Sequence, residues 1–122
     1  LKQRPNHDET MNNLANVLIN AKDPGALDMA ERAYNVDTRN PMLMDTAGWA
    51  NHLAGKSDRA LQLLRDARLR APDNPDIRYH LAAALAKAGR NGEAKEELRA
   101  ALRANVSFAS AEDAKKLLAT LN

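Results

Sequence analysis

Small and apolar residues recur along the chain at the three- and four-residue spacing that places them on one face of a helix. Ala60 and Leu64 lie on one such face, and Ala94 and Leu98 lie on the next. Ala26 begins a related series, and Ala26, Ala60 and Ala94 are equally spaced along the chain. A constant period of roughly 34 residues indicates an array of stacked helical hairpins.

Each period contains two amphipathic segments joined by a short turn. Gly55 and Gly89, which are one period apart, suit the left-handed position that ends a helix. Ser57 or Asp58 is expected to cap the helix that follows Gly55. The turn 22–25 is expected to be one residue shorter than the later turns. The predicted helices are 8–20, 25–35, 41–54, 59–70, 76–88 and 93–104, with a last helix ending at 121.

Both ends of the chain depart from the regular period. Ser110 followed by Asp113 is typical of a capping box and predicts a final helix whose Leu117, Leu118 and Leu121 face the stack. The first residues resemble the close of a repeat, so a further repeat is expected before Leu1; the alternative is an ordinary disordered N-terminus. The sequence therefore predicts an all-α, right-handed solenoid, divided into 1–7 (tail of a preceding repeat), 8–40, 41–74 and 75–106 (three repeats), and 107–122 (C-terminal capping helix).

Composition narrows the class of protein. Hydrophobic residues make up 44% of the chain but aromatic residues only 3%, which favours closely packed helices over strands. There is no Cys, which excludes disulfides and thiolate metal sites. The net charge of +2, from 18 basic and 16 acidic residues, argues against a nucleic-acid partner. No apolar run is long enough to insert into a membrane, and no catalytic or cofactor motif is present, so neither an enzyme nor a cofactor is expected.

The repeat resembles the tetratricopeptide repeat, a pair of helices with small residues where the helices touch. In the second unit the residues that carry the resemblance are Ala47, Gly48, Gly55, Ala60, Leu64, Ala67 and Pro72. In the third unit they are Leu81, Ala82, Leu85, Gly89, Ala94, Leu98 and Ala101, with Val106 in place of the closing proline. The resemblance implies stacked hairpins that bind other proteins on a concave surface.

Short strings around the first helix of each unit are similar to a bacterial subset of this family. They include Asn12-Asn13-Leu14-Ala15, the segment Asp45–Trp49 and Arg78-Tyr79-His80-Leu81. The subset consists of tetratricopeptide lipoproteins that accompany exopolysaccharide export and exosortase (PEP-CTERM) systems. This resemblance implies a periplasmic location, on the inner side of the outer membrane.

Side chains on the first helix of each unit that point away from the second helix are the candidate binding residues. Trp49 is the only tryptophan, and with Tyr79 it can anchor a partner, or it can pack between repeats. His52, His80 and Asp45 can form hydrogen bonds. They could also hold a metal, but the two histidines lack the i, i+4 spacing that is typical of a helical metal site. Arginines on the second helices, interleaved with acidic residues, indicate a salt-bridged solvated face. The candidate groove residues are Asn12, Asn16, Asp45, Trp49, His52, Tyr79, His80 and Ala83.

The function predicted from the sequence is that of a scaffold that binds a protein or peptide in the concave groove, as part of a larger bacterial assembly. Asn12 and Asn16, one helical turn apart, are expected to hydrogen-bond a peptide backbone. The alternative is a structural spacer, or a module that self-associates through an apolar surface at its Leu1 end.

Overall fold

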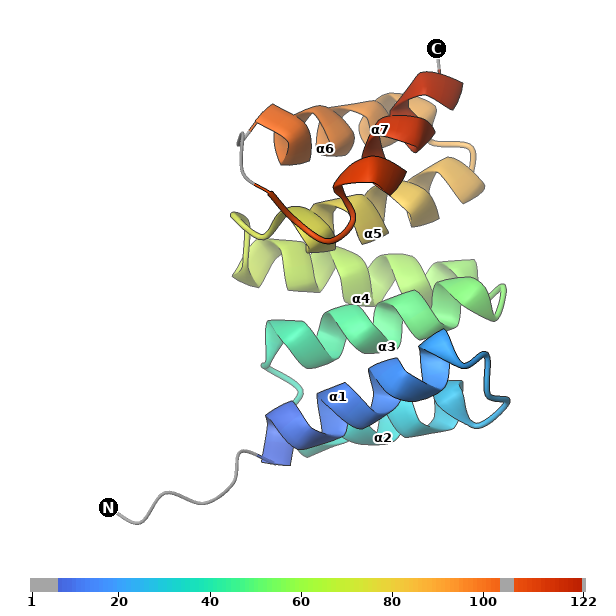
Figure 1. Cartoon of the computed structure of the whole chain (residues 1–122), viewed down its shortest axis with the longest axis vertical. Coiled ribbons are helices and arrows are strands. Elements are labelled where there is room, and N and C mark those ends of the chain that lie inside the picture. The colour runs from blue at the N-terminus through green and yellow to red at the C-terminus, as the bar shows by residue number, and fades with distance from the viewer. Residues whose placement is uncertain (1–6, 104–106, 122) are drawn as a thin grey trace.

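Seven helices account for the regular structure of the described residues, which are 7–103 and 107–121 of a computed structural model (Figure 1). They are α1 (His7–Asn20), α2 (Ala26–Val36), α3 (Pro41–Leu53), α4 (Ser57–Arg70), α5 (Pro75–Lys87), α6 (Asn91–Arg103) and α7 (Ala111–Thr120). No strand occurs in these residues, so the predicted all-α class is confirmed. None of the helices in the described ranges is long and apolar enough to cross a membrane.

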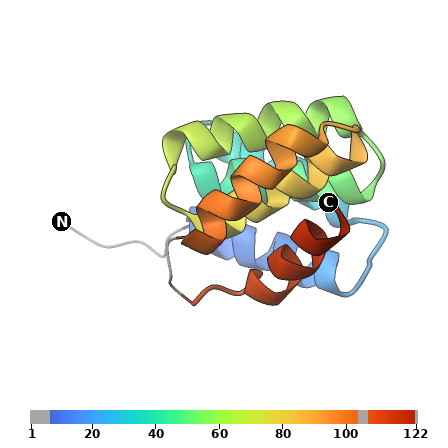
Figure 2. The same cartoon turned by 90° about the horizontal axis from the view of Figure 1, so that it is seen from above.

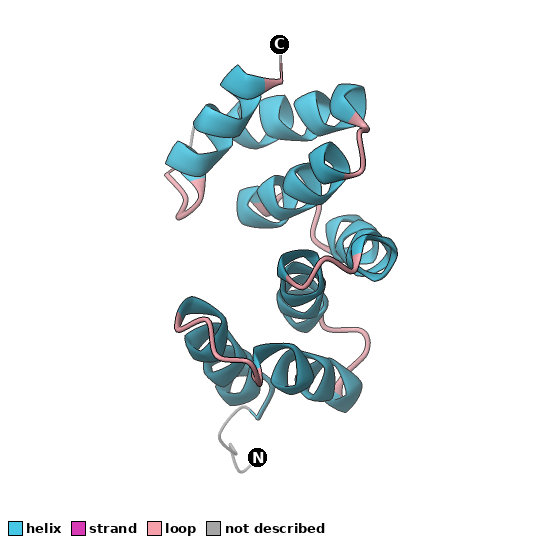
Figure 3. Ribbon diagram, turned by 90° about the vertical axis from the view of Figure 1, so that its right-hand side faces the viewer, coloured by secondary structure: helices cyan, strands magenta, loops and turns pink. Residues whose placement is uncertain are grey.

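The helices form three hairpins, α1/α2, α3/α4 and α5/α6, stacked in chain order with α7 on the last one. Seen from above, α1 and α7 lie along one side of the molecule and α4 lies along the opposite side (Figure 2). From the side the stack is a C-shaped arc with α1 and α7 at its two tips (Figure 3). The concave side is therefore formed by α1, α3, α5 and α7.

Prolines and glycines set the helix ends where the sequence predicts them. Pro41 and Pro75 occupy the first turns of α3 and α5, where a missing N–H costs no hydrogen bond. Gly55 and Gly89 have φ values of 81° and 82°, so both take the left-handed conformation after α3 and α5. A residue with a Cβ would be strained there.

The two predicted serine caps are wrong. Ser57 lies inside α4, whose preceding residue Lys56 makes no side-chain cap, and Ser110 precedes α7 without a side-chain cap. A capping side chain needs an extended backbone. Asn40 and Asn74 have ψ of 114° and 109° and do cap α3 and α5, whereas Ser110 has ψ of 11°.

The first turn is one residue shorter in register, as predicted, because Ala26 follows the left-handed residue Lys22 by four positions, whereas Ala60 follows Gly55 by five. Its non-helical part is nevertheless longer than in the other hairpins. Lys22, with φ of 57°, takes the left-handed position that Gly55 fills one unit later. The helices α4 and α6 start two residues after that position, but α2 starts only at Ala26. The connection therefore spans 21–25, against 54–56 and 88–90, and α2 lacks the first turn that the other second helices have.

Alanines and leucines between the hairpins form the core. One cluster of buried residues includes Leu64, Leu81, Leu85 and Leu98. Against it pack, as predicted, the half-buried Leu117 and Leu118 of α7 and Leu121 directly after α7. A second cluster joins α1, α2, α3 and α4 through Ala15, Ile19, Ala30, Ala47, Ala50 and Leu63. Small residues at these seams let neighbouring helix backbones approach closely, which fixes the positions of the side chains on the concave side.

Ion pairs connect neighbouring helices on the outer side, which confirms the salt-bridged face. Arg59 on α4 reaches Glu31 on α2 at 2.9 Å, and Arg65 on α4 reaches Glu93 on α6 at 3.3 Å. Glu97 on α6 pairs with Arg78 on α5 at 2.8 Å. Some of the interleaved charges of the second helices thus join one helix to the next.

Candidate partner-binding groove

The concave side holds a hollow of about 260 Å³ that extends from α1 across α3 to the start of α5 and α7. Figure 3 shows the open side of the arc on which it lies. Five predicted site residues line it: Asn12, Asn16, Asp45, Trp49 and His80. The other lining residues, which the sequence pattern did not single out, are Ile19, Asn20, Met42, Thr46, Asp76, Ala109 and Ser110.

Trp49 both packs between repeats and lines the hollow. It is half-buried against the cluster that contains Ile19 and Ala50. Its ring stacks on the rings of His52 and His80, with centroid distances of 4.9 and 4.4 Å. The packing interpretation of Trp49 is therefore confirmed, and its contact with a partner stays a prediction.

His80 and Asp45 join the second and third hairpins across the floor of the groove. His80 Nδ1 lies 2.7 Å from Asp45 Oδ1, and Asp45 is only 6% exposed. A carboxylate this buried needs such a partner, because desolvation of an unpaired charge is costly. No group of three His, Asp or Glu side chains in the described residues is arranged to hold a metal ion.

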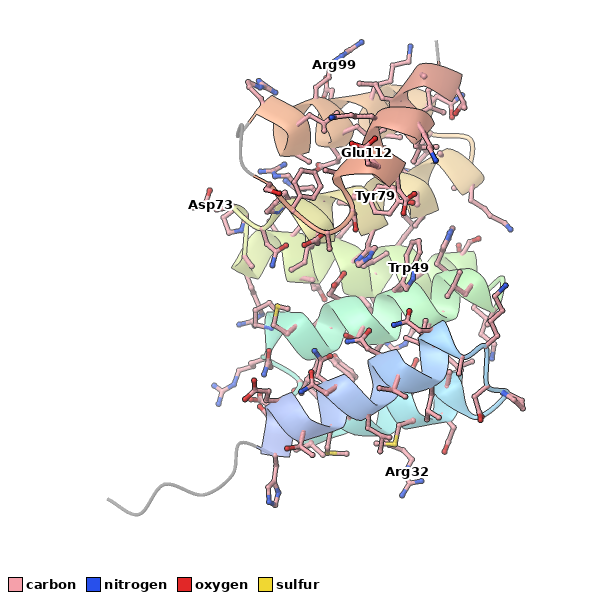
Figure 4. The ribbon with its side chains drawn as sticks, viewed as in Figure 1. Arg32, Trp49, Asp73, Tyr79, Arg99 and Glu112 are labelled. Carbon is pink, nitrogen blue, oxygen red and sulfur yellow. The ribbon has the colours of Figure 1, made fainter. Side chains whose placement is uncertain are left out.

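His52, Tyr79 and Ala83 are not among the residues that line the hollow. Tyr79 packs against the cluster beneath α7, and its ring centroid lies 5.9 Å from that of Trp49. Figure 4 labels both residues. Burial, with a smaller contribution from the Asp113 carboxylate, raises the pKa of the Tyr79 phenol. Burial, then the nearby charges of Lys87 and His80, lowers the pKa of His52. The aromatic side chains of the site thus pack against the core and against one another.

Three asparagines form a row along α1 facing the hollow: Asn12, Asn16 and Asn20, each one helical turn from the next. The Thr46 hydroxyl donates to Asn12 Oδ1, which holds the first amide against α3. The sequence contains the signal for Asn20, because it continues the i, i+4 spacing of the two predicted asparagines.

The sequence pattern did not identify Thr46 and Ser110 as site residues, because each contributes through a contact with a residue one repeat away. Thr46 bonds Asn12, and the Ser110 backbone N–H donates to Asp76 Oδ1 at 2.9 Å. In both pairs the two residues are separated by one full repeat period. Searching for polar pairs at the repeat spacing would have found both.

Comparison with known families decides the identity of the fold. The family model described as tetratricopeptide repeat matches residues 52–121, more than half of the chain. The chain belongs to the tetratricopeptide repeat family. A search of curated proteins gave no match. The tetratricopeptide prediction is confirmed, while the finer resemblance to exopolysaccharide-export lipoproteins stays a prediction.

Solved structures show the same tetratricopeptide architecture at low sequence identity. The type III secretion chaperone SycD of Yersinia enterocolitica, in complex with a peptide of the translocator YopD, has a TM-score of 0.73 at 17% identity, covering 93% of this chain and 87% of its own. PcrH of Pseudomonas aeruginosa, in complex with the chaperone-binding region of PopD, has a TM-score of 0.77 at 18% identity, covering 99% and 96%. The Arabidopsis OM64 tetratricopeptide domain has a TM-score of 0.75 at 21% identity, covering 91% and 93%.

Proposed function

We propose that this chain is a binding module that holds an extended segment of a protein partner in the concave groove of α1, α3 and α5. The observation that carries the proposal is the groove itself, in which the half-buried Trp49 ring and the asparagine row of α1 line a single hollow. An aromatic surface beside fixed amide groups offers both apolar contact and hydrogen bonds to one ligand. The proposed role is binding, with no chemistry of its own.

The asparagine row matches the repeat of an extended chain. Residues four apart on a helix rise about 6 Å, since each residue rises about 1.5 Å. Two residues of an extended peptide advance about 6.6 Å, so every second peptide unit can meet the next asparagine. A side-chain amide both donates and accepts hydrogen bonds, which is what a peptide backbone requires. Asn16 and Asn20 are the available members, since the Asn12 carbonyl already accepts from Thr46.

Two of the similar structures support a peptide as the ligand. SycD was solved with a peptide of YopD, and PcrH with a region of PopD. Both have the fold of this chain, and the groove described here is preformed, so a ligand does not have to open it. Preformed sites lose less free energy on binding than sites that must be ordered.

Selection from a library of short random peptides, displayed on phage, tests the proposal. Peptides selected on the intact chain are expected to lose about tenfold or more in affinity for Asn16→Ala and for Trp49→Ala, measured by calorimetry. Asn35→Ala is the matched control, because Asn35 is an exposed asparagine on α2. Equal affinity for Asn16→Ala and the unchanged chain would show that the ligand lies elsewhere.

Self-association is the second candidate, because the first hairpin exposes apolar side chains. Leu14, Val17 and Val36 are 47%, 61% and 53% exposed on α1 and α2. A second copy placed on this surface would bury them. Residue Leu1, on which the sequence-based version of this proposal depended, lies outside the described residues. Sedimentation velocity over a range of concentrations, on the chain and on Val17→Asp, distinguishes a dimer from a monomer.

We also propose that the chain acts within a bacterial assembly on the periplasmic side of the outer membrane. The resemblance to exopolysaccharide-export lipoproteins supports this location. Fractionation of the source cells, with an antibody against the chain, tests it. Recovery in the cytoplasmic fraction would contradict the periplasmic location and leave the groove proposal unchanged.

A further inference from the structure

A second hollow, of about 440 Å³, lies where the ends of α1 and α3 meet the start of α2. Its lining is mostly apolar and includes Ile19, Ala26, Leu27, Ala50, Leu53 and Ala54. Leu53 is 57% exposed although it is a large apolar residue, so its side chain has not found a covering within the described residues. The volume suits one or two bulky side chains of a ligand.

The hollow exists because α2 begins late. Ala26 corresponds to Ala60 and Ala94, which follow it at one and two repeat periods. The second and third hairpins carry three further helical residues before that alanine, in α4 from Ser57 and in α6 from Asn91. In the first hairpin those positions belong to the turn around Pro24, and the space beside Leu27 and Leu53 stays open.

This hollow continues the groove. Ile19 lines both, at the end of the asparagine row. On α3, Trp49 lines the groove and Leu53 lines the second hollow, and residues four apart on a helix are neighbours on one face. A peptide that follows Asn16 and Asn20 along α1 is therefore led to the apolar hollow at its end.

The rim adds a charge. Lys22 lines the opening and makes no ion pair in the part of the chain that the structure describes. The neighbouring Asp23 directs its Oδ1 to the Gly25 N–H, 2.7 Å away, inside the turn. The ammonium group is thus available to an acidic side chain of a ligand, while the carboxylate already has a hydrogen-bonded partner.

We propose that the second hollow is a specificity subsite of the groove. It receives a bulky apolar side chain of the bound peptide, and Lys22 pairs with an acidic side chain next to it in the peptide sequence. The inference rests on the proposed function, because it takes a peptide in the groove as its starting point. Apolar anchors that enter a pocket supply most of the affinity in many interfaces, so this subsite selects which segment is bound.

Filling the hollow tests the subsite. Ala54→Trp places a large side chain at its edge, and Ala88→Trp is the matched control. Ala88 is the equivalent of Ala54 one repeat later, ends α5 as Ala54 ends α3, and has nearly the same φ, −83° against −84°. Both alanines are exposed, so both variants are expected to fold, and circular dichroism with thermal melting checks this.

Peptides selected on the unchanged chain from the random library are the probes, and calorimetry measures their affinity. The inference predicts a bulky apolar residue beside an acidic one among these peptides, and a loss of about tenfold or more on Ala54→Trp but less than about twofold on Ala88→Trp. Replacing the apolar residue of a peptide by Ala should weaken binding to the unchanged chain and have little further effect on Ala54→Trp.

Each other outcome counts against the inference in its own way. Peptides that depend on Asn16 and Trp49 but bind Ala54→Trp normally would overturn the subsite and leave the groove function standing. Peptides that depend on none of these residues would overturn both proposals. The selected peptides could also carry the apolar anchor without an acidic neighbour and bind Lys22→Ala with unchanged affinity. That result would contradict the proposed pairing of Lys22 with an acidic side chain.

Discussion

Leu64 occupies the space that a Cβ atom on Gly48 would need. A Cβ built on Gly48 would lie 2.6 Å from Leu64 Cγ and 2.9 Å from Leu64 Cδ2. Both residues are buried, Gly48 in the middle of α3 and Leu64 in the middle of α4. The middle hairpin therefore depends on the absence of a side chain at this point, although the equivalent position of the third hairpin holds the buried Ala82.

Gly48→Ala is expected to lower the free energy of unfolding by about 1–3 kcal/mol, because Leu64 and α4 must shift in a packed core. The gain in helix propensity, up to about 1 kcal/mol, offsets only part of this. Urea denaturation followed by circular dichroism measures the net change in the free energy of unfolding. A Leu64→Ala background removes both of the close contacts with Leu64 and leaves the approach to Leu63 Cβ, at 3.3 Å, so the same Gly48→Ala change should cost much less there. Destabilisation of the same size in both backgrounds would contradict the clash.

Asparagine caps, not serine caps, are expected to hold the helix starts. Asn74→Ala should cost about 1 kcal/mol, since Asn74 Oδ1 accepts the Ile77 N–H at 3.1 Å. Ser110→Ala should change the free energy of unfolding by less than about 0.5 kcal/mol, because its hydroxyl makes no cap. Thermal melting of the two variants checks the contrast, and an equal loss would mean that Ser110 caps α7 after all.

Glu31 is expected to matter more than its ion-pair partner Arg59. Its carboxylate accepts from Arg59 and, at 2.7 Å, from the buried Asn51 amide. The Arg59 pair is partly exposed and contributes no more than about 1 kcal/mol, whereas Glu31→Ala also removes a partner of a buried amide. Chemical denaturation should therefore show a larger loss for Glu31→Ala than for Arg59→Ala. The reverse order would show that the exposed pair dominates.

Glu31 also predicts an acid dependence. The hydrogen bond from Arg59, opposed by burial and aided by Asn51, lowers the pKa of Glu31 below its ordinary 4.5. A carboxyl with a lowered folded pKa contributes stability above its ordinary pKa, and this contribution is lost as the pH falls through the folded pKa. Melting temperatures on acidification should fall less steeply for Glu31→Gln than for the unchanged chain. Parallel curves for the two proteins would rule Glu31 out as the source of the acid dependence.

His52 predicts a change nearer neutral pH. Burial lowers its pKa below the ordinary 6.5, so the folded state disfavours its protonation more than the unfolded state does. The contribution of His52 to stability is thus present above pH 6.5 and is lost as the pH falls from there through the folded pKa. His52→Gln is expected to flatten the pH dependence below pH 6.5. An unchanged slope would show that another group titrates there.

Sequence periodicity predicted the number and order of helices because the same small residues must recur wherever hairpins touch. The α7 cap and the glycines 55 and 89 followed from the same logic. The difference between α2 and the other second helices was not predicted, because the sequence pattern gave all three the same register, with starts at 25, 59 and 93, whereas α4 and α6 begin two residues earlier, at Ser57 and Asn91. Five groove residues were predicted from helix faces, whereas the roles of Thr46 and Asp76 depend on which hairpins lie in contact.

The polar contacts between successive layers have a mechanical consequence. Asn12 with Thr46, Asp45 with His80 and Asp76 with Ser110 each connect one layer of the arc to the next on its inner side. Bending the arc open would stretch all three, while the outer ion pairs would be compressed. Resistance to opening is therefore distributed over the successive layers of the molecule, and short polar contacts on the inner side set how far apart α1 and α7 lie.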